Sequence, residues 1–460
     1  MRKIIYLKRR FWQNGSVGES IKCKTISIDF MYPMKVFMGF SLIAVTVLIL
    51  FLFTSCEKED PWSLIYDKGS GTPGDPWLIS TAEQFDNIRN ILNGNYRLVA
   101  DIDLERHTAD TGWISIGNSE AGFTGTLDGN GHSITGVVKS GIFGFTAEGS
   151  VIKDLTLKSV NVTEGFKYFF QHTTGTLVDL NEGEILNCSV TGIVTGVVNV
   201  SFGGLVGINR GNIVDCNVDV DISECGSMGG ITDINYGYIT GCHTYGTITN
   251  HQSSFAAGGI CVLNFGNISE SKASVDISGS WSHERSAGGF VAKNPGTITR
   301  SYSTGNIELI IRRAEMWQSF ADTGAGGFAG TSPDAGNFRD CYATGNVSVT
   351  FDYDPKYFRV FTGGFSGIGG NISNCYAVGK VSGDDSGGLV GGEIEGVAST
   401  RAIVTSSYYN KETSGQDDVG MGIPKTTAEM MQQATFEGWD FQEIWKIDEG
   451  SSYPSLRWQE

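Results

Sequence analysis

The sequence has 460 residues, with 33 lysines and arginines against 50 aspartates and glutamates, and its formal net charge is −17 at pH 7. Such an acidic chain does not attract nucleic acid or an anionic membrane through its bulk charge. An acidic polysaccharide would need a local basic patch. The composition therefore predicts no nucleic-acid partner.

An apolar run near the amino terminus precedes a cysteine. Residues 36–53 carry no charge, and Thr54-Ser55-Cys56 and then charged residues follow them. A basic residue, an apolar run, small residues and a cysteine together resemble a bacterial lipoprotein signal. The resemblance implies cleavage before Cys56 and acylation of Cys56, which would attach the protein to a membrane through lipid. An apolar run of this length could instead span a bilayer as a transmembrane anchor.

The segment before this run is too long for the basic region of a signal peptide. We therefore interpret residues 1–33 as a mis-annotated leader, with translation starting at Met34 or Met31, and residues 34–55 as the signal peptide. The acidic residues after the cysteine resemble signals that send lipoproteins to the outer face of the cell. We expect an exported outer-membrane lipoprotein displayed at the cell surface.

A tether and a cap are expected before the main body of the chain. Residues 56–75 are rich in Gly, Pro, Asp and Ser, which predicts a flexible tether. Ser80-Thr81-Ala82-Glu83 has capping-box spacing ahead of apolar residues at helical intervals, which predicts a short helix. Residues 76–112 should form an N-terminal cap, because solenoid ends expose unpaired strand edges.

Residues 113–410 repeat one pattern. Each copy has an Asn-x-Gly turn followed by Ile, and the copies are 26 to 30 residues apart. The turn asparagines of five successive copies are Asn181, Asn209, Asn235, Asn264 and Asn294. A fixed period in this range is the signature of a stacked repeat protein.

The pattern inside each copy predicts the type of repeat. A Cys or Ser follows the Ile by three residues, and from there apolar and polar residues alternate as in a half-buried strand. The Ile and the Cys both point inward at an odd separation, so a bend must lie between them. We predict three short strands per copy and an all-β, right-handed parallel β-helix with short helical caps at both ends. A β-propeller blade would need about 40 residues.

In this fold, equivalent residues of neighbouring coils stack about 4.8 Å apart. The turn asparagines should then form a hydrogen-bonded ladder. Tyr302, Tyr342 and Tyr376 fall in one outward column, which predicts a stack of tyrosine rings. Parallel Cβ vectors do not suit disulfides, so we interpret the cysteine column as buried thiols that fill space.

A recurrent Gly-x-x-Gly segment is similar to the GLUG motif of a family of bacterial surface repeat proteins. Its copies include Gly141-Ile142-Phe143-Gly144, Gly204-Leu205-Val206-Gly207, Gly327-Phe328-Ala329-Gly330, Gly364-Phe365-Ser366-Gly367 and Gly388-Leu389-Val390-Gly391. The copies at Gly230 and Gly259 depart from it. The entry segment at residues 123–134 also resembles this family. The resemblance implies the β-helix and an adhesin-like role, but no particular activity.

No catalytic or metal-binding constellation is expected. The sequence has no C-x-x-C pair, no H-E-x-x-H motif and no G-x-S-x-G elbow. Outward carboxylates such as Asp219, Asp221 and Asp276 do not gather into a cluster, because Thr247 separates two of them. We predict no cofactor. A polysaccharide lyase or glycoside hydrolase on a β-helix scaffold stays the alternative function.

The longest insertions all fall between the third strand and the next Gly-Gly. Stacking should gather them on one face, which is often the binding face of a repeat protein. Their aromatic and arginine side chains suit a glycan or a protein partner. The candidate ligand-binding residues are Trp281, Arg285, Arg313, Trp317, Tyr353, Tyr357 and Phe358. Alternatively, the loops pack on the coil wall, or the protein is a purely structural stalk.

Residues 411–460 should close the second end of the solenoid. Thr426-Thr427-Ala428-Glu429 again has capping-box spacing, and Trp439, Phe441, Trp445 and Tyr453 supply apolar bulk. We expect this segment to be the C-terminal cap.

Overall fold

The computed structural model describes residues 65–105, 112–137, 140–162, 173–196, 200–251, 255–281, 286–312, 323–333, 336–353, 359–395, 397–418 and 421–459. Two compact units are present, Met1–Ser70 and Gly71–Glu460. Cys56 and the apolar run at 36–53 lie outside the described residues. Within the described ranges, no helix has both the length and the apolar character needed to cross a membrane.

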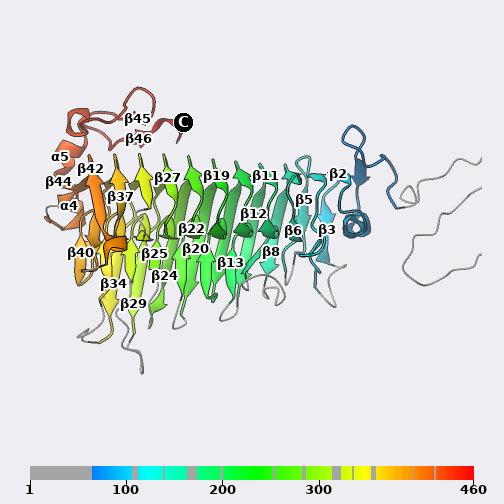
Figure 1. Ribbon diagram of the computed structural model, residues 1–460, viewed down its shortest axis with the longest axis horizontal. Coiled ribbons are helices and arrows are strands. Elements are labelled where there is room, and N and C mark those ends of the chain that lie inside the picture. Colours follow the sequence, from blue (N-terminus) through cyan, green and yellow to red (C-terminus); the bar gives the residue numbers. More distant parts are fainter. Residues whose placement is uncertain are drawn as a thin grey trace, which may run out of the picture. The chain divides into compact units, whose positions relative to one another are not determined.

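The second unit is a parallel β-helix with four long sheets, and the coils from Thr173 onward contribute to all four (Figure 1). One coil consists of β13 (Ser201–Gly203), β14 (Val206–Asn209), β15 (Asn212–Val214) and β16 (Asn217–Ser223). Each strand pairs in parallel with its counterpart in the next coil. We number the sheets 1 to 4 in the order in which this coil enters them. The predicted all-β parallel β-helix is confirmed, and its right hand stays a prediction.

Sheets 1 and 2 are the shorter pair. Sheet 1 contains β9 (Thr173–Gly175), β13, β17 (Ser227–Gly229), β21 (Ala256–Gly258), β25 (Ser286–Gly288), β30 (Gly324–Gly326), β35 (Phe361–Gly363) and β40 (Asp385–Gly387). Sheet 2 contains β6 (Phe143–Thr146), β10 (Val178–Asn181), β14, β18 (Thr232–Asn235), β22 (Cys261–Asn264), β26 (Val291–Lys293), β31 (Ala329–Thr331), β36 (Ser366–Ile368) and β41 (Val390–Gly392).

Sheets 3 and 4 begin earlier in the chain and are longer. Sheet 3 contains β1 (Trp77–Ile79), β2 (Asn95–Leu98), β4 (Thr126–Asp128), β7 (Val151–Lys153), β11 (Glu184–Leu186), β15, β19 (Tyr238–Thr240), β23 (Asn267–Ser269), β27 (Thr297–Thr299), β32 (Asn337–Arg339), β37 (Gly370–Ser373) and β42 (Ala402–Thr405). Sheet 4 contains β3 (Ile102–Asp103), β5 (Ser133–Thr135), β8 (Thr156–Val162), β12 (Ser189–Thr195), β16, β20 (His243–Asn250), β24 (Lys272–Trp281), β28 (Tyr302–Ser303), β29 (Ile307–Ile311), β33 (Tyr342–Ala343), β34 (Val347–Phe351), β38 (Tyr376–Ala377), β39 (Val381–Ser382), β43 (Tyr408–Asn410) and β44 (Ile423–Lys425).

The prediction of three strands per coil was wrong, because a corner divides the glycine-rich segment into two strands. The chain turns at Gly204 and Leu205, between β13 and β14. A Cβ on Gly203 would overlap the carbonyl oxygen of Val206, and one on Gly204 would overlap the carbonyl oxygen of Gly230 in the next coil. Only glycine fits at these two positions, so the Gly-Gly pair forms a corner instead of opening a strand.

The predicted bend between the Ile and the Cys is confirmed. Asp215, just before Cys216, has a φ of 53°. The same position has a positive φ in the neighbouring coils, at Asp154, Asn187, Gly241, Glu270, Arg300, Asp340, Asn374 and Ser406. This left-handed residue turns the chain from sheet 3 into sheet 4.

The cysteine column lies behind this bend. Its members are Cys188, Cys216, Cys242, Cys341 and Cys375. These five and the other two described cysteines, Cys225 and Cys261, are all buried and free. The amide N–H of Cys188 donates to Sγ of Cys216 at 3.4 Å, and the amide of Cys242 donates to Oγ of Ser271 at 3.2 Å. Cys and Ser therefore fill equivalent inward positions, as the sequence predicts.

The predicted asparagine ladder is present inside the corner between sheets 2 and 3. Nδ2 of each turn asparagine donates to Oδ1 of the next at 2.7 to 2.8 Å, from Asn181 through Asn209, Asn235 and Asn264 to Asn294. All five side chains are buried. The ladder satisfies polar groups that would otherwise lack partners in the interior, and it keeps successive coils in register.

The helix of the N-terminal cap begins one residue later than the sequence predicts. α2 (Ala82–Asp86) continues into the 3₁₀-helix η2 (Asn87–Asn90), and Oγ1 of Thr81, not Ser80, accepts the capping hydrogen bond from the amide of Gln84. Phe85 and Ile88 are fully buried. The ring of Phe85 lies 5.7 Å from that of Trp113 at the start of the repeats.

The sequence predicts that residues 411–460 cap the second end of the solenoid. Only the first part of this segment lies across that end. The 3₁₀-helix η5 (Ala398–Thr400) belongs to the last coil. After β43, α4 (Lys411–Ser414) leads to β44, which pairs with β43. Oδ1 of Asp418 accepts the amide N–H of Gly388, and the Tyr409 hydroxyl donates to the carbonyl of Asp418 at 2.6 Å. Residues 411–418 and 421–425 thus cover the last coil.

Residues 426–459, which we call the strap, turn back along the outside of the coils (Figure 1). The strap contains α5 (Thr427–Met430), the 3₁₀-helices η6 (Gln433–Thr435) and η7 (Arg457–Gln459), and the antiparallel pair β45 (Trp445–Lys446) and β46 (Ser455–Leu456). The predicted capping box of Thr426 and Glu429 is confirmed.

The strap packs on the predicted tyrosine column. Tyr302, Tyr342 and Tyr376 stack with ring centroids 4.8 and 4.9 Å apart, and Tyr408 extends the column. The strap buries these rings under Met430, Phe436, Trp439, Trp445 and Leu456.

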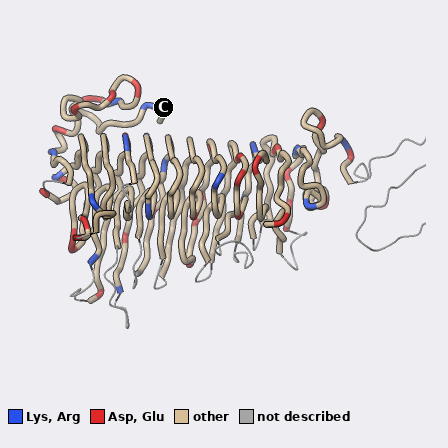
Figure 2. Tube along the Cα trace, in the orientation of Figure 1, with Lys and Arg blue, Asp and Glu red and all other residues tan. Residues whose placement is uncertain are grey.

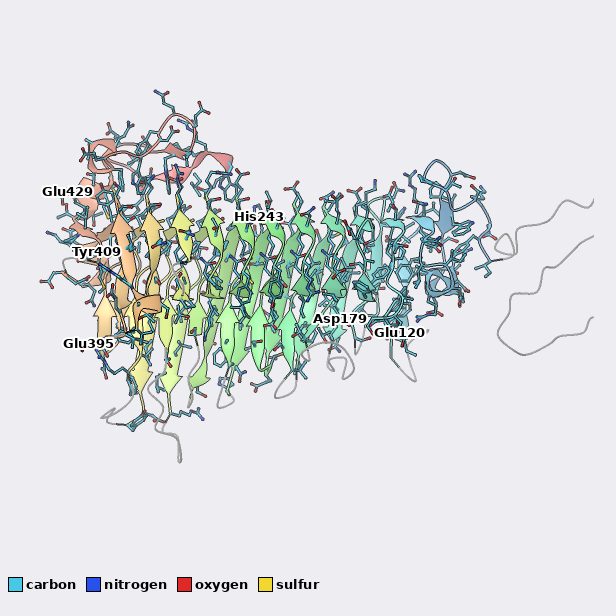
Figure 3. All side chains as sticks on the ribbon, viewed as in Figure 1. Glu120, Asp179, His243, Glu395, Tyr409 and Glu429 are labelled. Atoms are coloured by element: carbon cyan, nitrogen blue, oxygen red, sulfur yellow. The ribbon has the colours of Figure 1, made fainter. Side chains whose placement is uncertain are left out.

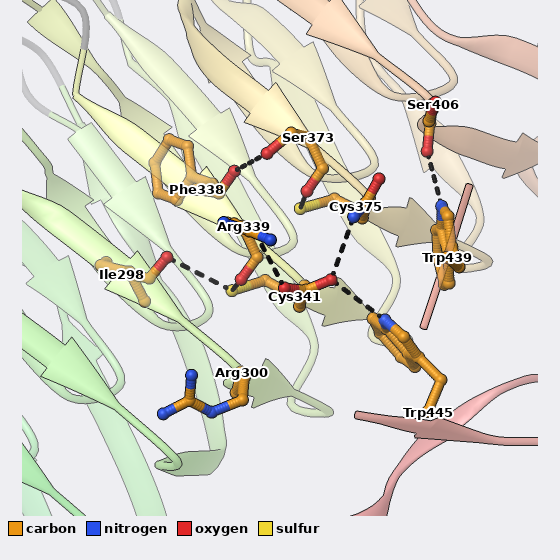
Figure 4. A network of polar contacts seen from close by, with 12 residues as sticks. Ile298, Arg300, Phe338, Arg339, Cys341, Ser373, Cys375, Ser406, Trp439 and Trp445 are labelled. Atoms are coloured by element: carbon orange, nitrogen blue, oxygen red, sulfur yellow. Dashed lines mark hydrogen bonds and ion pairs between the residues drawn. The ribbon is translucent and has the colours of Figure 1, made fainter. Parts of the chain in front are cut away.

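Three indole N–H groups of the strap bind the corners between sheets 3 and 4. Trp439 donates to the carbonyl of Ser406 at 2.8 Å, and Trp445 donates to Oδ1 of Asp340 at 3.2 Å (Figure 4). Trp458 donates to the carbonyl of Arg300 at 2.8 Å. These bonds fix the strap over several coils.

Candidate ligand-binding surfaces

The insertions between sheets 4 and 1 leave from strands that pair side by side. Trp281, Ile311 and Phe351 end β24, β29 and β34, and they are partners in the register of sheet 4. The chain returns at Ser286, Gly324 and Phe361, which are partners in sheet 1. Both stems of three insertions are thus in register on adjacent coils. The stems of these insertions therefore gather on one face, which we call the loop face.

Most of the predicted ligand residues lie outside the described residues. These are Arg285, Arg313, Trp317, Tyr357 and Phe358. Trp281 is described only through its backbone, and its register partner Ile311 is buried. The half-buried ring of Tyr353 lies edge-on to Phe351, with centroids 6.0 Å apart. Ligand binding by these residues stays a prediction.

A charged pair stands at the returning stem of the last insertion. Arg359 donates to both carboxylate oxygens of Asp385 at 2.7 and 2.6 Å, and its guanidinium lies 4.9 Å from the ring centre of Phe361. The hydrogen bonds that Arg359 donates to Asp385 raise the pKa of Arg359. Because both ends of the pair are satisfied, its main effect is to hold this stem against the neighbouring coil.

Two outward carboxylates of sheet 4 bind backbone amides of the next coil. Oδ1 of Asp221 accepts the amide and the hydroxyl of Thr247 at 2.9 and 2.7 Å. Oδ1 of Asp276 accepts the amide of Asn306 at 2.7 Å. Each carboxylate therefore links its coil to the next, as Asn306 and Asn346 do further along. In the described ranges, no three His, Cys, Asp or Glu side chains converge on a point.

Two buried carboxyl groups lie between sheets 1 and 2. Asp233 accepts hydrogen bonds from Ser227 at 2.5 Å and Thr173 at 3.2 Å, and burial raises its pKa to about 6. Asp179 (Figure 3) accepts one from the Gly175 amide at 3.2 Å, and no described residue bonds its Oδ2. Burial raises the pKa of Asp179 well above its usual range. Both carboxyl groups are buried.

A second surface follows the Asn-x-Gly corner between sheets 2 and 3. Glu148, Glu182, Glu184, Arg210 and Tyr238 line a hollow of about 610 Å³ there, together with Gly149, Ser150, Val151, Gly183, Gly211 and Asn212. Tyr238 is 59% exposed. We call this hollow the corner groove.

One wall of the corner groove continues as a row of interacting side chains. These occupy the middle position of Asn-x-Gly in successive coils. Glu182 pairs with Arg210 at 3.3 Å, and the Arg210 guanidinium lies 5.8 Å from the ring centre of Tyr236. The rings of Tyr236 and Phe265 stack with centroids 5.1 Å apart and an angle of 3°. Tyr236 is 46% exposed and Phe265 48% exposed.

Sequence reasoning did not single out these aromatic residues, although a signal was available. In Asn-x-Gly the asparagine points inward and the glycine forms the corner, so the residue between them must face solvent. An aromatic residue at that position, as in Asn235-Tyr236-Gly237 and Asn264-Phe265-Gly266, is therefore exposed by the turn itself. Figure 2 shows basic residues scattered singly over the coils.

Comparisons with known proteins give relatives with general names. A scan against protein-family models finds no match. The chain is 31% identical to a protein of Evansella cellulosilytica named "Putative Gly-rich membrane protein", over 90% of this chain and 48% of the relative. It is also 31% identical to halomucin of Haloquadratum walsbyi, over 28% of this chain and 2% of halomucin. The chain thus spans at most about half the length of these curated relatives.

Among solved structures, the chain is similar to one described as a putative immunoglobulin A1 protease from Bacteroides ovatus. The two share 19% sequence identity with a TM-score of 0.45, over 86% of this chain and 96% of that structure.

Proposed function

We propose that this protein is a surface-anchored, non-catalytic lipoprotein of adhesin-like character, which binds a glycan or a protein through its loop face. One observation carries the proposal. The stems of three insertions are in register at both ends, at Trp281, Ile311 and Phe351 and again at Ser286, Gly324 and Phe361. The insertions therefore leave the coils from one face, and their aromatic and arginine residues would form the multivalent binding surface of this proposal.

Four carboxylates on sheet 4 and between sheets 1 and 2 support a non-catalytic role. Glycosidase chemistry needs two carboxyl groups that flank a bond and are free to exchange protons. Asp221 and Asp276 instead accept amide hydrogen bonds from the next coil. Asp179 and Asp233 are buried between sheets.

The anchoring rests on the sequence around Cys56 and on the name of one relative. The segment before Cys56 resembles a lipoprotein signal, and the relative from Evansella cellulosilytica is named as a membrane protein. A cell-envelope location agrees with both, and the resemblance to the GLUG repeat family adds surface display. Lipid attachment at Cys56 would place the β-helix outside the membrane. The end of the expected tether at residues 56–75 is fixed to the coils, because the carbonyl of Gly71 accepts hydrogen bonds from the amide and the side chain of Asn95 at 3.0 and 2.9 Å.

The loop assignment can be tested with Arg313→Ala combined with Trp317→Ala. The full chain, purified in detergent, would be applied to immobilised glycans and to immobilised surface proteins of candidate host cells. The double variant should lose affinity for the ligand that the wild type binds, whereas Tyr245→Ala on the outer face of sheet 4 should retain it. Equal affinity of the wild type and the double variant would refute the loop assignment.

The lipid anchor has its own test. Cells that express the protein are grown with a radiolabelled fatty acid, and the protein is then recovered. We expect label in the wild type, none in Cys56→Ala, and protease accessibility of the wild type on intact cells. An unlabelled wild type would contradict the lipoprotein interpretation and favour the apolar run at 36–53 as a transmembrane anchor.

A further inference from the structure

The corner groove has a floor that side chains cannot fill. Gly183, Gly211 and Gly237 occupy the third position of the Asn-x-Gly turn in successive coils. A Cβ on Gly211 would overlap the carbonyl oxygen of Gly183, and one on Gly237 would overlap that of Gly211. Stacking of the coils therefore requires glycine here, and the floor consists of backbone along the whole line of turns.

Side chains of two kinds stand beside this floor. On the sheet 3 side, Glu184, Asn212 and Tyr238 are partners in register and face outward. On the other side is the row of Glu182, Arg210 and the exposed aromatics. Carboxylates, amides and a guanidinium are planar groups that bind neighbouring hydroxyls, and an exposed tyrosine ring packs on an apolar face.

The geometry of the groove fits a linear polymer. Equivalent positions recur in each coil about every 4.8 Å along the stack. A linear polymer that lies along the corner can therefore place successive units on successive coils, beside Glu184, Asn212 and Tyr238 in turn. A small molecule would contact the residues of only one coil, whereas a polymer gains affinity with each further coil that it contacts.

The charge of the groove selects among polymers. Glu182 is paired with Arg210, but neither Glu148 nor Glu184 forms an ion pair with a described residue. The groove is thus locally negative, within a protein of net charge −17. An anionic polymer would be repelled, since like charges at an interface oppose binding.

We propose that the corner groove binds a polysaccharide without acidic groups, which lies along the stacked turns with its hydroxyls on Glu184, Asn212 and Glu148 and a sugar face on Tyr238. This site is separate from the loop face, so either surface can fail a test without the other.

The test uses the detergent-purified full chain and biolayer interferometry on immobilised polysaccharides. Mixed-linkage β-glucan and galactomannan are the uncharged probes, and polygalacturonate is the anionic one. Tyr238→Ala should weaken binding of an uncharged probe about tenfold, the loss of one good aromatic contact. Tyr245→Ala is the matched control, because it removes a tyrosine that is 39% exposed on the next sheet of the same coil. It should leave binding within twofold of wild type.

A charge reversal gives an independent readout. Glu184→Arg should weaken preference for the uncharged probes and create measurable binding of polygalacturonate. Arg313→Ala with Trp317→Ala, which tests the loop face, should leave binding in the groove unchanged. The proposal is overturned if the wild type binds no uncharged probe, if it prefers polygalacturonate, or if Tyr238→Ala and Tyr245→Ala behave alike. Loss of binding only in the loop variant would retain the proposed function and remove the groove.

Discussion

Asn235 offers the sharpest test of how the coils are held together. Its side chain is fully buried. It accepts from Asn209 at 2.8 Å and donates to Asn264 at 2.8 Å and to the carbonyl of Gly237 at 3.3 Å. Replacement by alanine removes these bonds. It also leaves Oδ1 of Asn264 without the hydrogen-bond donor that Asn235 supplies in the ladder. A net hydrogen bond contributes about 1 kcal/mol and a buried group without a partner costs about 1–3 kcal/mol, so Asn235→Ala should destabilise the protein by roughly 3–5 kcal/mol.

Asn267→Ala is the matched control for this change. Asn267 belongs to the next coil and is exposed on sheet 3. Its removal should change the free energy of unfolding by less than about 0.5 kcal/mol. Equilibrium urea unfolding, followed by far-UV circular dichroism, measures both variants against the wild type. If Asn235→Ala cost no more than Asn267→Ala, the ladder would not stabilise the stack and the account of the corner would be refuted.

Three further changes probe other parts of the fold. Trp445→Ala should lower the free energy of opening the strap by about 3–5 kcal/mol and speed hydrogen exchange in residues 426–459 only. Faster exchange throughout the coils would show that the strap does not open separately. Gly204→Ala should lower the free energy of unfolding by about 1–3 kcal/mol or more, because the new Cβ would overlap the carbonyl oxygen of Gly230. In the same urea assay Gly74→Ala should be nearly neutral, because a Cβ there meets no atom within 4 Å. The raised pKa of Asp233, about 6 against 3.8, means that the folded state holds a proton that the unfolded state releases. Its stabilising effect is therefore present below pH 3.8 and is lost as the pH rises through 6. At pH 7.5, Asp233→Asn should therefore have a higher free energy of unfolding than the wild type, by about 3 kcal/mol at most, and a higher urea midpoint. At pH 3.5 the two proteins should differ little. Equal urea midpoints at pH 7.5 would refute this.

The repeat made most of the β-helix predictable from the sequence. A buried asparagine, an inward Ile and an inward Cys or Ser recur at a nearly constant period, and each of these columns is present in the structure. The bend before Cys216 followed from the odd spacing of two inward residues. The number of strands did not follow, because Gly203 and Gly204 fit a strand and a corner equally well in sequence. Only the carbonyl of the neighbouring coil excludes a side chain there.

The position of the strap could not be deduced from local sequence. Its aromatic residues are apolar bulk that would suit an end cap as well as a side face. The partners that decide its place lie far away in the chain, since Trp445 binds Asp340 and Trp458 binds Arg300. The tyrosine column was predicted, but not that another part of the chain covers it.

The candidate surfaces were predictable in part. Register at the stems shows that the insertions leave adjacent coils on one face, which the sequence predicted from their shared position before the next Gly-Gly. The corner groove depends on which way a turn presents its middle residue, so it becomes visible only once the turn is placed at a corner of the coil. Tyr236 and Phe265 are exposed for that reason.

The central claim is that this β-helix binds a ligand without altering it. The most direct measurement incubates the detergent-purified full chain with a panel of bacterial, plant and host polysaccharides and follows both components by size-exclusion chromatography. We predict that the protein co-elutes with at least one polymer and that the polymer keeps its original chain length. A polymer shortened by the wild-type protein would contradict the account and establish a lyase or a hydrolase in its place.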